Sequence, residues 1–253
     1  MPKPKLWLQS RVSNDGKYHE TNEGALYSTR FQEVLSFHAP GLAPAKNGNR
    51  WFHIKPDGTP AYSKTFDQVF GYYEGRAAVE AKGKWFHILE NGRPAYKRRF
   101  LWCGNYQEGL CVVRDLNGIF FHVNLKGENV YDEGYLYVGD FKEGVAVATK
   151  KDGQCFHILP NGKPLNGSFF NGLGVYHKGI ATARDRRGWF HIDKLGDGLY
   201  DQRYLSVEPF YNGLALCVTK KGKTVRINTA GEEKEQISAK ENREIGQRNL
   251  KTS

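Results

Sequence analysis

The stretch WFHIKPDG, Trp51–Gly58, decides how this chain folds, because it returns along the sequence at a fixed spacing. It comes back as WFHILENG from Trp85 and as WFHIDKLG from Trp189. Its histidine recurs every 34 or 35 residues, with an arginine in the seventh slot, at His19, His53, His87, His122, His157, His191 and Arg226. A marker glycine keeps the same period, at Gly41, Gly75, Gly109, Gly144, Gly179 and Gly213. Two markers with one period identify an array of about seven repeats.

Each repeat has the pattern of short antiparallel strands. An alternating run of small residues, such as GRAAV or GVAVA, follows the marker glycine. A glycine turn such as AKG or KDG leads into the FHI segment, and a second turn such as PDG or PNG ends it. Asn-Gly and Asp-Gly between alternating segments are strong hairpin signals, because type I′ turns need positive φ at both central residues. With no 3.6-residue period in any segment, the sequence predicts four short strands in each repeat.

The predicted fold is all-β, a β-propeller-like array of about seven small antiparallel blades of 34–35 residues each. Radial repetition leaves few exposed strand edges, which favours the propeller, and an open linear β-repeat array is the alternative. The repeats span residues 1–231, which we expect to form one domain. Residues 232–253 hold five acidic and five basic residues, and we expect a charged tail that is a marginal helix or disordered.

The repeats resemble the WG repeat found in many bacterial proteins. The match runs through units such as GLAPAKNGNRWFHIKPDGTPAYSKTFDQVFGYYEG, and it covers roughly residues 8–231. The chain departs from the family at the defining core, where WFHI replaces the usual WGFI and tryptophan keeps its slot only at Trp51, Trp85 and Trp189. The resemblance implies a divergent subtype of a non-catalytic interaction module, with protein partners expected.

The recurring histidine is predicted to be structural. In WFHI, Trp51 and His53 point to one face of the strand and Phe52 and Ile54 to the other. A buried imidazole needs hydrogen-bond partners, and a tyrosine slot supplies candidates at Tyr27, Tyr62, Tyr96, Tyr131 and Tyr200. Equivalent histidines of successive blades would lie too far apart to share one ion at a ligand distance of about 2 Å. We therefore expect no metal and no cofactor, and a structural role for His53, His87, His122, His157 and His191.

The net charge of +10 comes from 37 basic and 27 acidic residues. The tail is neutral, so the excess lies in residues 1–231. In an antiparallel blade, the turns before the FHI strands and the segments after the tyrosine slot emerge on one side. The residues predicted to form a basic binding face there are Lys82, Lys84, Arg98, Arg99, Trp102, Lys150, Lys151, Arg186, Arg187, Lys220 and Lys221, with Arg30, Lys64, Lys97, Arg203 and Lys223 beside them. Such a face suits anionic or phosphate-bearing partners, nucleic acid included.

Two other functions stay open. A carbohydrate-binding, lectin-like propeller would use turn residues beside aromatic rings, such as Asp57, Asn91, Asn117 and Asn161. An enzyme is not expected, because no catalytic motif recurs and the glycines follow the repeat period rather than a phosphate-binding fingerprint. A catalytic site would have to lie where the repeat is irregular, at residues 167–179 or at Phe37–Ala45.

The chain ends and the cysteines bear on location. No apolar run is long enough to cross a bilayer, and MPKPKLWLQS lacks the apolar stretch of a signal peptide. These features favour the cytoplasm, although a protein secreted by another route would look the same. Cys103, Cys111, Cys155 and Cys217 show no metal-binding spacing, and we expect them to be small buried apolar residues.

Overall fold

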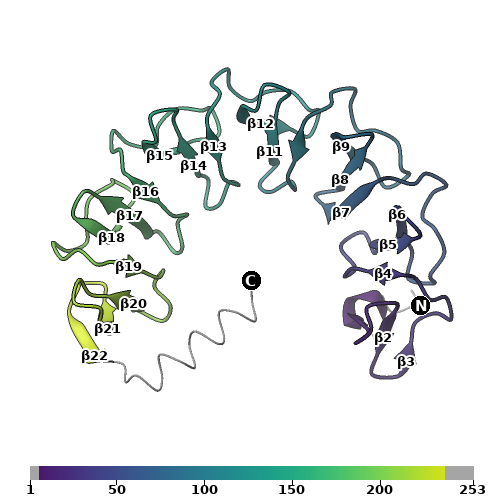
Figure 1. The fold of residues 1–253 in the computed structure, drawn as a ribbon, viewed down its shortest axis with the longest axis horizontal. Coiled ribbons are helices and arrows are strands. Elements are labelled where there is room, and N and C mark those ends of the chain that lie inside the picture. Colours follow the sequence, from purple (N-terminus) through teal and green to yellow (C-terminus); the bar gives the residue numbers. More distant parts are fainter. Residues whose placement is uncertain (1–5, 237–253) are drawn as a thin grey trace, which may run out of the picture. The chain divides into compact units, whose positions relative to one another are not determined.

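The computed structural model describes residues 6–236. Within this range the chain is β structure apart from one short 3-10 helix, η1 (Leu6–Gln9). Its strands form seven small antiparallel sheets, each built from one stretch of the sequence (Figure 1). The predicted all-β array of seven small antiparallel units is confirmed. The sheets belong to two compact units, residues 1–134 and residues 135–253, which are described in turn.

The first unit contains four three-stranded sheets. They are β1 (Arg11–Val12), β2 (His19–Thr21) and β3 (Gly24–Ala25); β4 (Glu33–Val34), β5 (Ala43–Asn47) and β6 (Arg50–Ile54); β7 (Gln68–Tyr73), β8 (Arg76–Ala81) and β9 (Lys84–Ile88); and β10 (Trp102–Cys103), β11 (Leu110–Arg114) and β12 (Phe120–Asn124). In each sheet the strands pair in chain order, as hairpins do.

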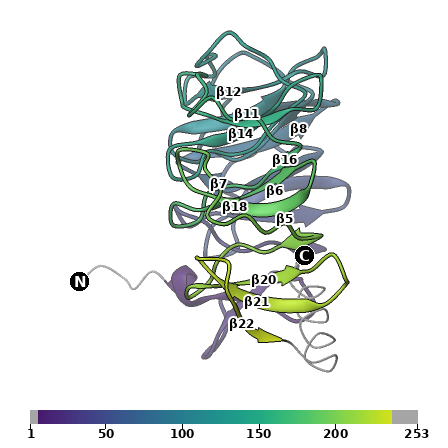
Figure 2. The same cartoon turned by 90° about the vertical axis from the view of Figure 1, so that its left-hand side faces the viewer.

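The second unit contains two three-stranded sheets and a final four-stranded one. They are β13 (Tyr137–Val138), β14 (Ala146–Thr149) and β15 (Cys155–Ile158); β16 (Gly172–Leu173), β17 (Ala181–Asp185) and β18 (Gly188–Ile192); and β19 (Ser206–Val207), β20 (Leu214–Val218), β21 (Thr224–Asn228) and β22 (Glu233–Gln236). Figure 2 shows β20, β21 and β22 side by side in the last sheet.

Strand β22 corrects one prediction, because the tail was expected to begin at residue 232 as a marginal helix or disordered segment. Residues 233–236 instead pair with β21, with Arg226 opposite Glu235 and Ile227 opposite Glu233. The high charge of the segment hid this strand, since an edge strand needs few apolar side chains to pair through its backbone. The rest of the predicted tail, residues 237–253, lies outside the described residues.

Each complete sequence repeat contains four segments, and one of these four is not a regular strand. After β6, the chain touches that strand only through isolated bridges, Ile54 with Pro60 and Trp51 with Phe66. The residues between the bridges bulge outward, and the same arrangement recurs after β9, β15 and β18. A proline at or near the first bridge has no N–H to donate, which suits it to an irregular edge.

Small residues in the middle strands form the cores. In the third sheet, Ala77 and Val79 of β8 are fully buried beside Ile88 of β9. The alternation places these side chains on one face, where their small volume lets the next layer of aromatic rings pack closely. The cysteines Cys103, Cys111 and Cys217 are buried, Cys155 is half-buried, and all four are free thiols. Burial raises the pKa of Cys217 to about 12, so its thiol stays protonated.

The recurring histidine links neighbouring sheets. The Nε2 atom of His53, in β6, lies 2.8 Å from the carbonyl oxygen of Phe70, in β7 of the next sheet. A carbonyl oxygen only accepts, so Nε2 carries the proton and Nδ1 is left to accept from the hydroxyl of Tyr62. The same pair of contacts recurs as His19 with Tyr27 and Leu35, His87 with Tyr96 and Gly104, and His191 with Tyr200 and Glu208.

His122, in β12, keeps the tyrosine contact of this pattern and bonds the Tyr131 hydroxyl at 2.5 Å. One histidine varies the pattern. His157 bonds the carbonyl of Gly174 at 3.0 Å, and Leu165 fills its tyrosine slot. Burial lowers the pKa of His157 to about 4, and it does the same for His53 and His87. These rings are therefore neutral near pH 7, as the hydrogen-bond pattern requires.

The tyrosine of this pattern also touches the next sheet. A Cβ atom on Gly92, in the turn after β9, would lie 2.6 Å from the Tyr62 ring. Gly231 and Tyr200 are related in the same way, at 2.7 Å. Only glycine fits at these turns, both because of the ring and because their φ angles are +73° and +77°. One His–Tyr pair thus fixes the distance between two successive sheets.

Candidate anion-binding site on two turns

The turn between β17 and β18 holds two exposed arginines. Asp185 and Gly188 pair across the hairpin, which leaves Arg186 and Arg187 as its two turn residues. The carboxylate of Asp185 accepts from the backbone N–H of Arg187 at 2.7 Å and of Gly188 at 3.1 Å. A short acidic side chain at this position closes a turn by standing in for a backbone carbonyl. Both arginine side chains are therefore held out at the end of the hairpin.

The turn between β20 and β21 presents three lysines. Its last strand pair is Val218 with Thr224. The carbonyl of Thr219 accepts from the N–H of Gly222 at 2.9 Å, and the Thr219 hydroxyl accepts from the N–H of Lys223 at 3.1 Å. These bonds fix the backbone of the turn and do not involve the lysine side chains. The lysines exposed in this turn are Lys220, Lys221 and Lys223.

The two turns line adjoining grooves. One groove, of about 310 Å³, runs along Trp189 and receives Arg184, Arg186, Arg187 and Lys220. The other, of about 490 Å³, receives Lys220, Lys221 and Lys223, and the two grooves share Tyr204. We call the six exposed cationic residues the basic cluster: Arg184, Arg186, Arg187, Lys220, Lys221 and Lys223.

Acidic side chains neutralise only part of the basic cluster. Asp185 lies 3.6 Å from the Nε of Arg187 and 2.8 Å from the Nε of Arg203. Burial would raise the pKa of Asp185, but the hydrogen bonds from Arg203 and the turn backbone lower it overall, so the carboxylate is ionised. Glu233 also lines the second groove. The other five cluster residues form no ion pair with any residue in the described range.

Arg203 contacts the protein itself more than its cationic neighbours do. Its guanidinium lies 3.5 Å from the ring centre of Phe190, and only 10% of the side chain is exposed. It also donates to the carbonyls of Tyr200, Asp201 and Gln202. Arg203 therefore braces its bulged segment, and it also lines the second groove.

The remaining predicted site residues of the second unit stay apart from this cluster. Lys150 and Lys151 belong to the turn between β14 and β15. The ammonium of Lys150 lies 4.3 Å from the ring centre of Phe169, an aromatic contact that holds its stem along the surface. The turn thus keeps one fully exposed cation, Lys151.

In the first unit, two of the predicted residues are exposed but hydrogen-bond to their own chain. Arg99 stacks 3.8 Å from the ring centre of Phe86 and donates to the carbonyls of its own bulged segment, as Arg203 does. Arg98 donates to the carbonyl of Gly127 and to the side chain of Asn129. Gly127 follows β12, whereas the turn between β11 and β12 lies at the other end of that strand. The guanidinium of Arg98 therefore does not lie with the turn cations, because the bulge re-aims its side chain.

The other predicted residues of this unit are exposed. Lys82 occupies the turn between β8 and β9, and Lys84 begins β9. Trp102, in β10, is 37% exposed, with its ring centre 6.5 Å from that of Phe120. Lys82, Lys84 and Trp102 line neither of the two grooves of the basic cluster.

Sequence reasoning missed two groups at the grooves. Arg184 was overlooked because it precedes the turn, although strand alternation after the buried Ala181 and Ala183 places it outward. Trp189 was treated as a repeat marker, yet it lines the groove of about 310 Å³. A pattern that assigns tryptophan to the core in every repeat conceals such a use.

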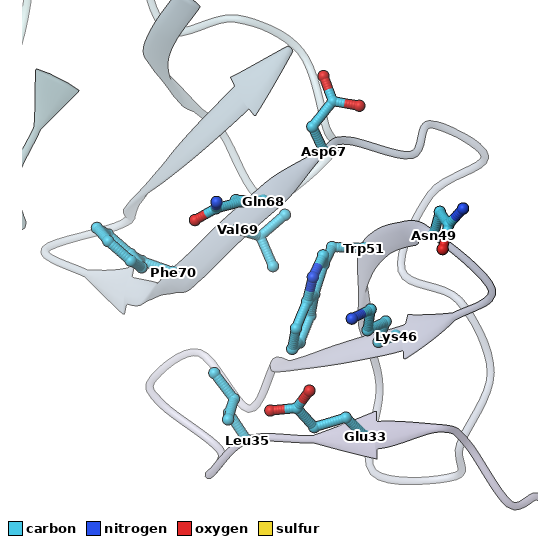
Figure 3. Close-up of a pocket in the computed structure, with 9 residues that line it drawn as sticks. All are labelled: Glu33, Leu35, Lys46, Asn49, Trp51, Asp67, Gln68, Val69 and Phe70. Carbon is cyan, nitrogen blue, oxygen red and sulfur yellow. The ribbon is translucent and has the colours of Figure 1, made fainter. Parts of the chain in front are cut away.

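A groove of about 470 Å³ in the first unit lies beside the tryptophan of the opening stretch. Figure 3 shows Trp51 between Lys46 and Glu33 on one side and Gln68 and Val69 on the other. Glu33 and Lys46 are cross-strand neighbours in β4 and β5, and the Lys46 ammonium lies 5.6 Å from the Trp51 ring centre. The sequence analysis did not predict this groove, because its polar residues lie outside the turns.

Comparison with a family model identifies the repeat. The model described as WG containing repeat matches residues 54–85, from the end of β6 to the tryptophan of β9. This segment of the chain is a WG repeat. The matched segment runs from the FHI strand of one repeat to the FHI strand of the next. It therefore includes the bulged segment and the marker glycine Gly75. The predicted resemblance is confirmed.

Solved structures similar to this chain include the computationally designed Ika8 protein, at 16% identity over 82% of this chain and 76% of that one, with a TM-score of 0.48. BamB from Moraxella catarrhalis is similar at 12% identity over 78% and 67%, with a TM-score of 0.46. The WD40 β-propeller domain of Doa1 is similar at 15% identity over 80% and 77%, with a TM-score of 0.36. No curated protein sequence matches the chain. The part of the chain described here has no helix able to span a membrane.

Proposed function

We propose that this WG-repeat protein is a non-catalytic binding module and that the basic cluster receives a phosphate-bearing partner. The observation that carries the proposal is the joining of two neighbouring turns into adjoining grooves with six exposed cations. Repeat scaffolds commonly bind through the loops that their rigid strands hold in place. Here the strands and the buried histidines supply the rigid part, and the turns supply the charge.

The types of cation favour phosphate. An arginine guanidinium donates through a planar fork that matches two phosphate oxygens, and a lysine ammonium adds a mobile point charge. Arg186 and Arg187 stand on one turn, and Lys220 and Lys221 on the next. A single nucleic-acid strand is the first partner to test, because its repeated phosphates can contact both turns at once. Trp189, half-buried in the first groove, offers a ring edge to such a strand.

The test is the binding of a fluorescently labelled single-stranded RNA to the full chain, followed by anisotropy from low to rising salt. A triple variant, Arg186→Gln, Lys220→Gln and Lys221→Gln, should bind several-fold more weakly at low salt. The matched control is Lys82→Gln with Lys84→Gln, which removes charge from two exposed residues that line neither groove of the basic cluster. Absence of RNA binding even at low salt, or an equal loss in both variants, would remove the proposal.

A second candidate, binding of a neutral carbohydrate, is supported by the groove beside Trp51. A half-buried indole ring with carboxylate and amide groups around it can stack on a sugar ring and bond its hydroxyls. Glu33, Lys46 and Gln68 surround Trp51, and their side chains form no hydrogen bond with other described residues. A glycan-array screen at high salt separates the two candidates, since sugar binding persists there and phosphate binding weakens. Loss of the array signal in Glu33→Gln and Gln68→Ala variants would assign it to this groove.

A further inference from the structure

Five of the six marker glycines, all except Gly41, lie in turns that share one backbone conformation. The turn between β16 and β17 has Lys178 at φ +52° and Gly179 at φ +79°, and the turn between β19 and β20 has Asn212 at φ +51° and Gly213 at φ +78°. Two consecutive residues in this conformation point their N–H groups to one side of the turn. Such a pair of amides forms a small concave site that attracts anions.

In the chain itself, this site binds a carboxylate. Glu143 precedes the marker glycine of one repeat, and it reaches the corresponding turn of the next repeat. Its Oε1 accepts from the N–H of Lys178 at 2.6 Å and its Oε2 from the N–H of Gly179 at 3.0 Å. Glu74 acts in the same way on Gly109, at 2.9 Å. Burial would raise the pKa of Glu143, but these backbone bonds and the nearby Lys194 and Lys142 lower it overall.

The turn at Asn212–Gly213 lacks such a carboxylate. The residue that occupies the place of Glu143 one repeat later is Lys178, and an ammonium cannot accept a hydrogen bond. Tyr211 and Leu214 close the turn through their own backbone bonds, at 2.9 and 3.1 Å. Within residues 6–236, neither the N–H of Asn212 nor that of Gly213 has a hydrogen-bond partner. In two other repeats a glutamate of the preceding repeat occupies this amide site. In this repeat the site is open, and Lys178 stands where the glutamate would be.

The open turn is accessible and has a recess beside it. Asn212 and Gly213 are exposed, and Asn212 lines a groove of about 360 Å³ together with Tyr211. The Tyr211 ring is 62% exposed and packs 5.1 Å from the ring of His177, measured between centres. Glu208 and Arg226 also line the groove, one charge of each sign. An incoming group can therefore reach both amides without any rearrangement of the backbone.

We propose that the Asn212–Gly213 turn binds a carboxylate from an acidic polypeptide partner, in the manner in which Glu143 binds the Lys178–Gly179 turn. The two backbone amides bond the two carboxylate oxygens, and Lys178 supplies the attracting charge. This site differs from the basic cluster, because it precedes β20 whereas the lysine turn follows that strand. The five residues of β20 separate the two sites by roughly 15 Å.

The test follows backbone amides by ¹H–¹⁵N NMR in the full chain, with sodium acetate as the probe and sodium chloride at equal ionic strength as the reference. The N–H signals of Asn212 and Gly213 should move saturably with acetate and not with chloride. The signal of Gly179 should stay in place, because Glu143 already occupies its turn. Equal responses to both salts would overturn the proposal.

Two variants sharpen the test. Lys178→Glu restores the carboxylate of the repeat, so the Asn212 and Gly213 signals should shift downfield without acetate and no longer respond to it. Glu143→Ala removes the internal carboxylate, so the Gly179 signal should gain an acetate response. Acetate shifts at Asn212 that persist unchanged in Lys178→Glu would contradict the assigned site.

Discussion

The ring of His53 joins two sheets by donating from Nε2 to the carbonyl oxygen of Phe70 over 2.8 Å. The donor lies in β6 and the acceptor in β7, and the same bond recurs from repeat to repeat. Because the His53 ring is fully buried, its Nε2 cannot exchange this bond for one with water. Within each compact unit the repeated histidine therefore fixes the position of one sheet on the next, and the turns that carry the basic cluster are held by that packing.

The hydroxyl of Tyr62 should be essential to this joint. Tyr62→Phe leaves the Nδ1 of His53 buried without a donor, which is expected to lower the free energy of unfolding by about 1–3 kcal/mol. Urea denaturation measures the change. The matched control is Tyr211→Phe, whose side chain is exposed, and it should cost less than about 0.5 kcal/mol. Equal effects of the two substitutions would show that the His53–Tyr62 bond does not stabilise the fold.

Stability should fall as the medium becomes mildly acidic. Burial lowers the pKa of His53, His87 and His157 to about 4, below the unfolded value of 6.5. Between these values the unfolded chain binds more protons, so their contribution is complete above pH 6.5 and is lost as pH falls toward 4. From pH 7.5 to 5.5 the three rings together should cost roughly 4 kcal/mol. Denaturation at the two pH values measures the loss, and an unchanged free energy of unfolding would contradict it.

Arg203 should matter for stability rather than for binding. Arg203→Gln removes the stacking on Phe190, the bond to Asp185 and three bonds to carbonyls. We expect a loss of about 2 kcal/mol or more, since bonds to charged groups are worth about 1.5–3 kcal/mol each. Arg186→Gln, at an exposed turn, should stay within about 0.5 kcal/mol. Thermal denaturation of both variants measures the two losses. Equal melting temperatures for the two variants would show that Arg203 acts only as a surface charge.

The repeat period and the strand pattern could be predicted from the sequence, because hydrogen-bonded hairpins demand glycine turns and alternating side chains at fixed positions. The tyrosine partners of His53 and His87 could be predicted too, since a buried imidazole has few possible partners within one repeat. Strand β22 could not, because Glu233–Gln236 pairs through its backbone and carries no apolar pattern.

The candidate site was predicted in part. Arg186, Arg187, Lys220 and Lys221 do come together, because neighbouring hairpins present equivalent turns at the same end of their strands. Arg98 and Arg99 did not follow the expectation of free cations. The Arg99 guanidinium donates to the carbonyls of its own bulged segment, and the Arg98 guanidinium donates to the carbonyl of Gly127. No local sequence pattern encodes these two side-chain directions.

The salt dependence of RNA binding tests the central claim most directly. For the unaltered chain, the logarithm of the association constant should fall linearly with the logarithm of salt concentration. Each phosphate contact adds about 0.7 to the slope for a single strand, so Arg186→Gln with Lys220→Gln and Lys221→Gln should reduce it by about 2. The Lys82→Gln and Lys84→Gln control should keep the slope of the unaltered chain. A triple variant with an undiminished slope would contradict the assignment of phosphate binding to the basic cluster.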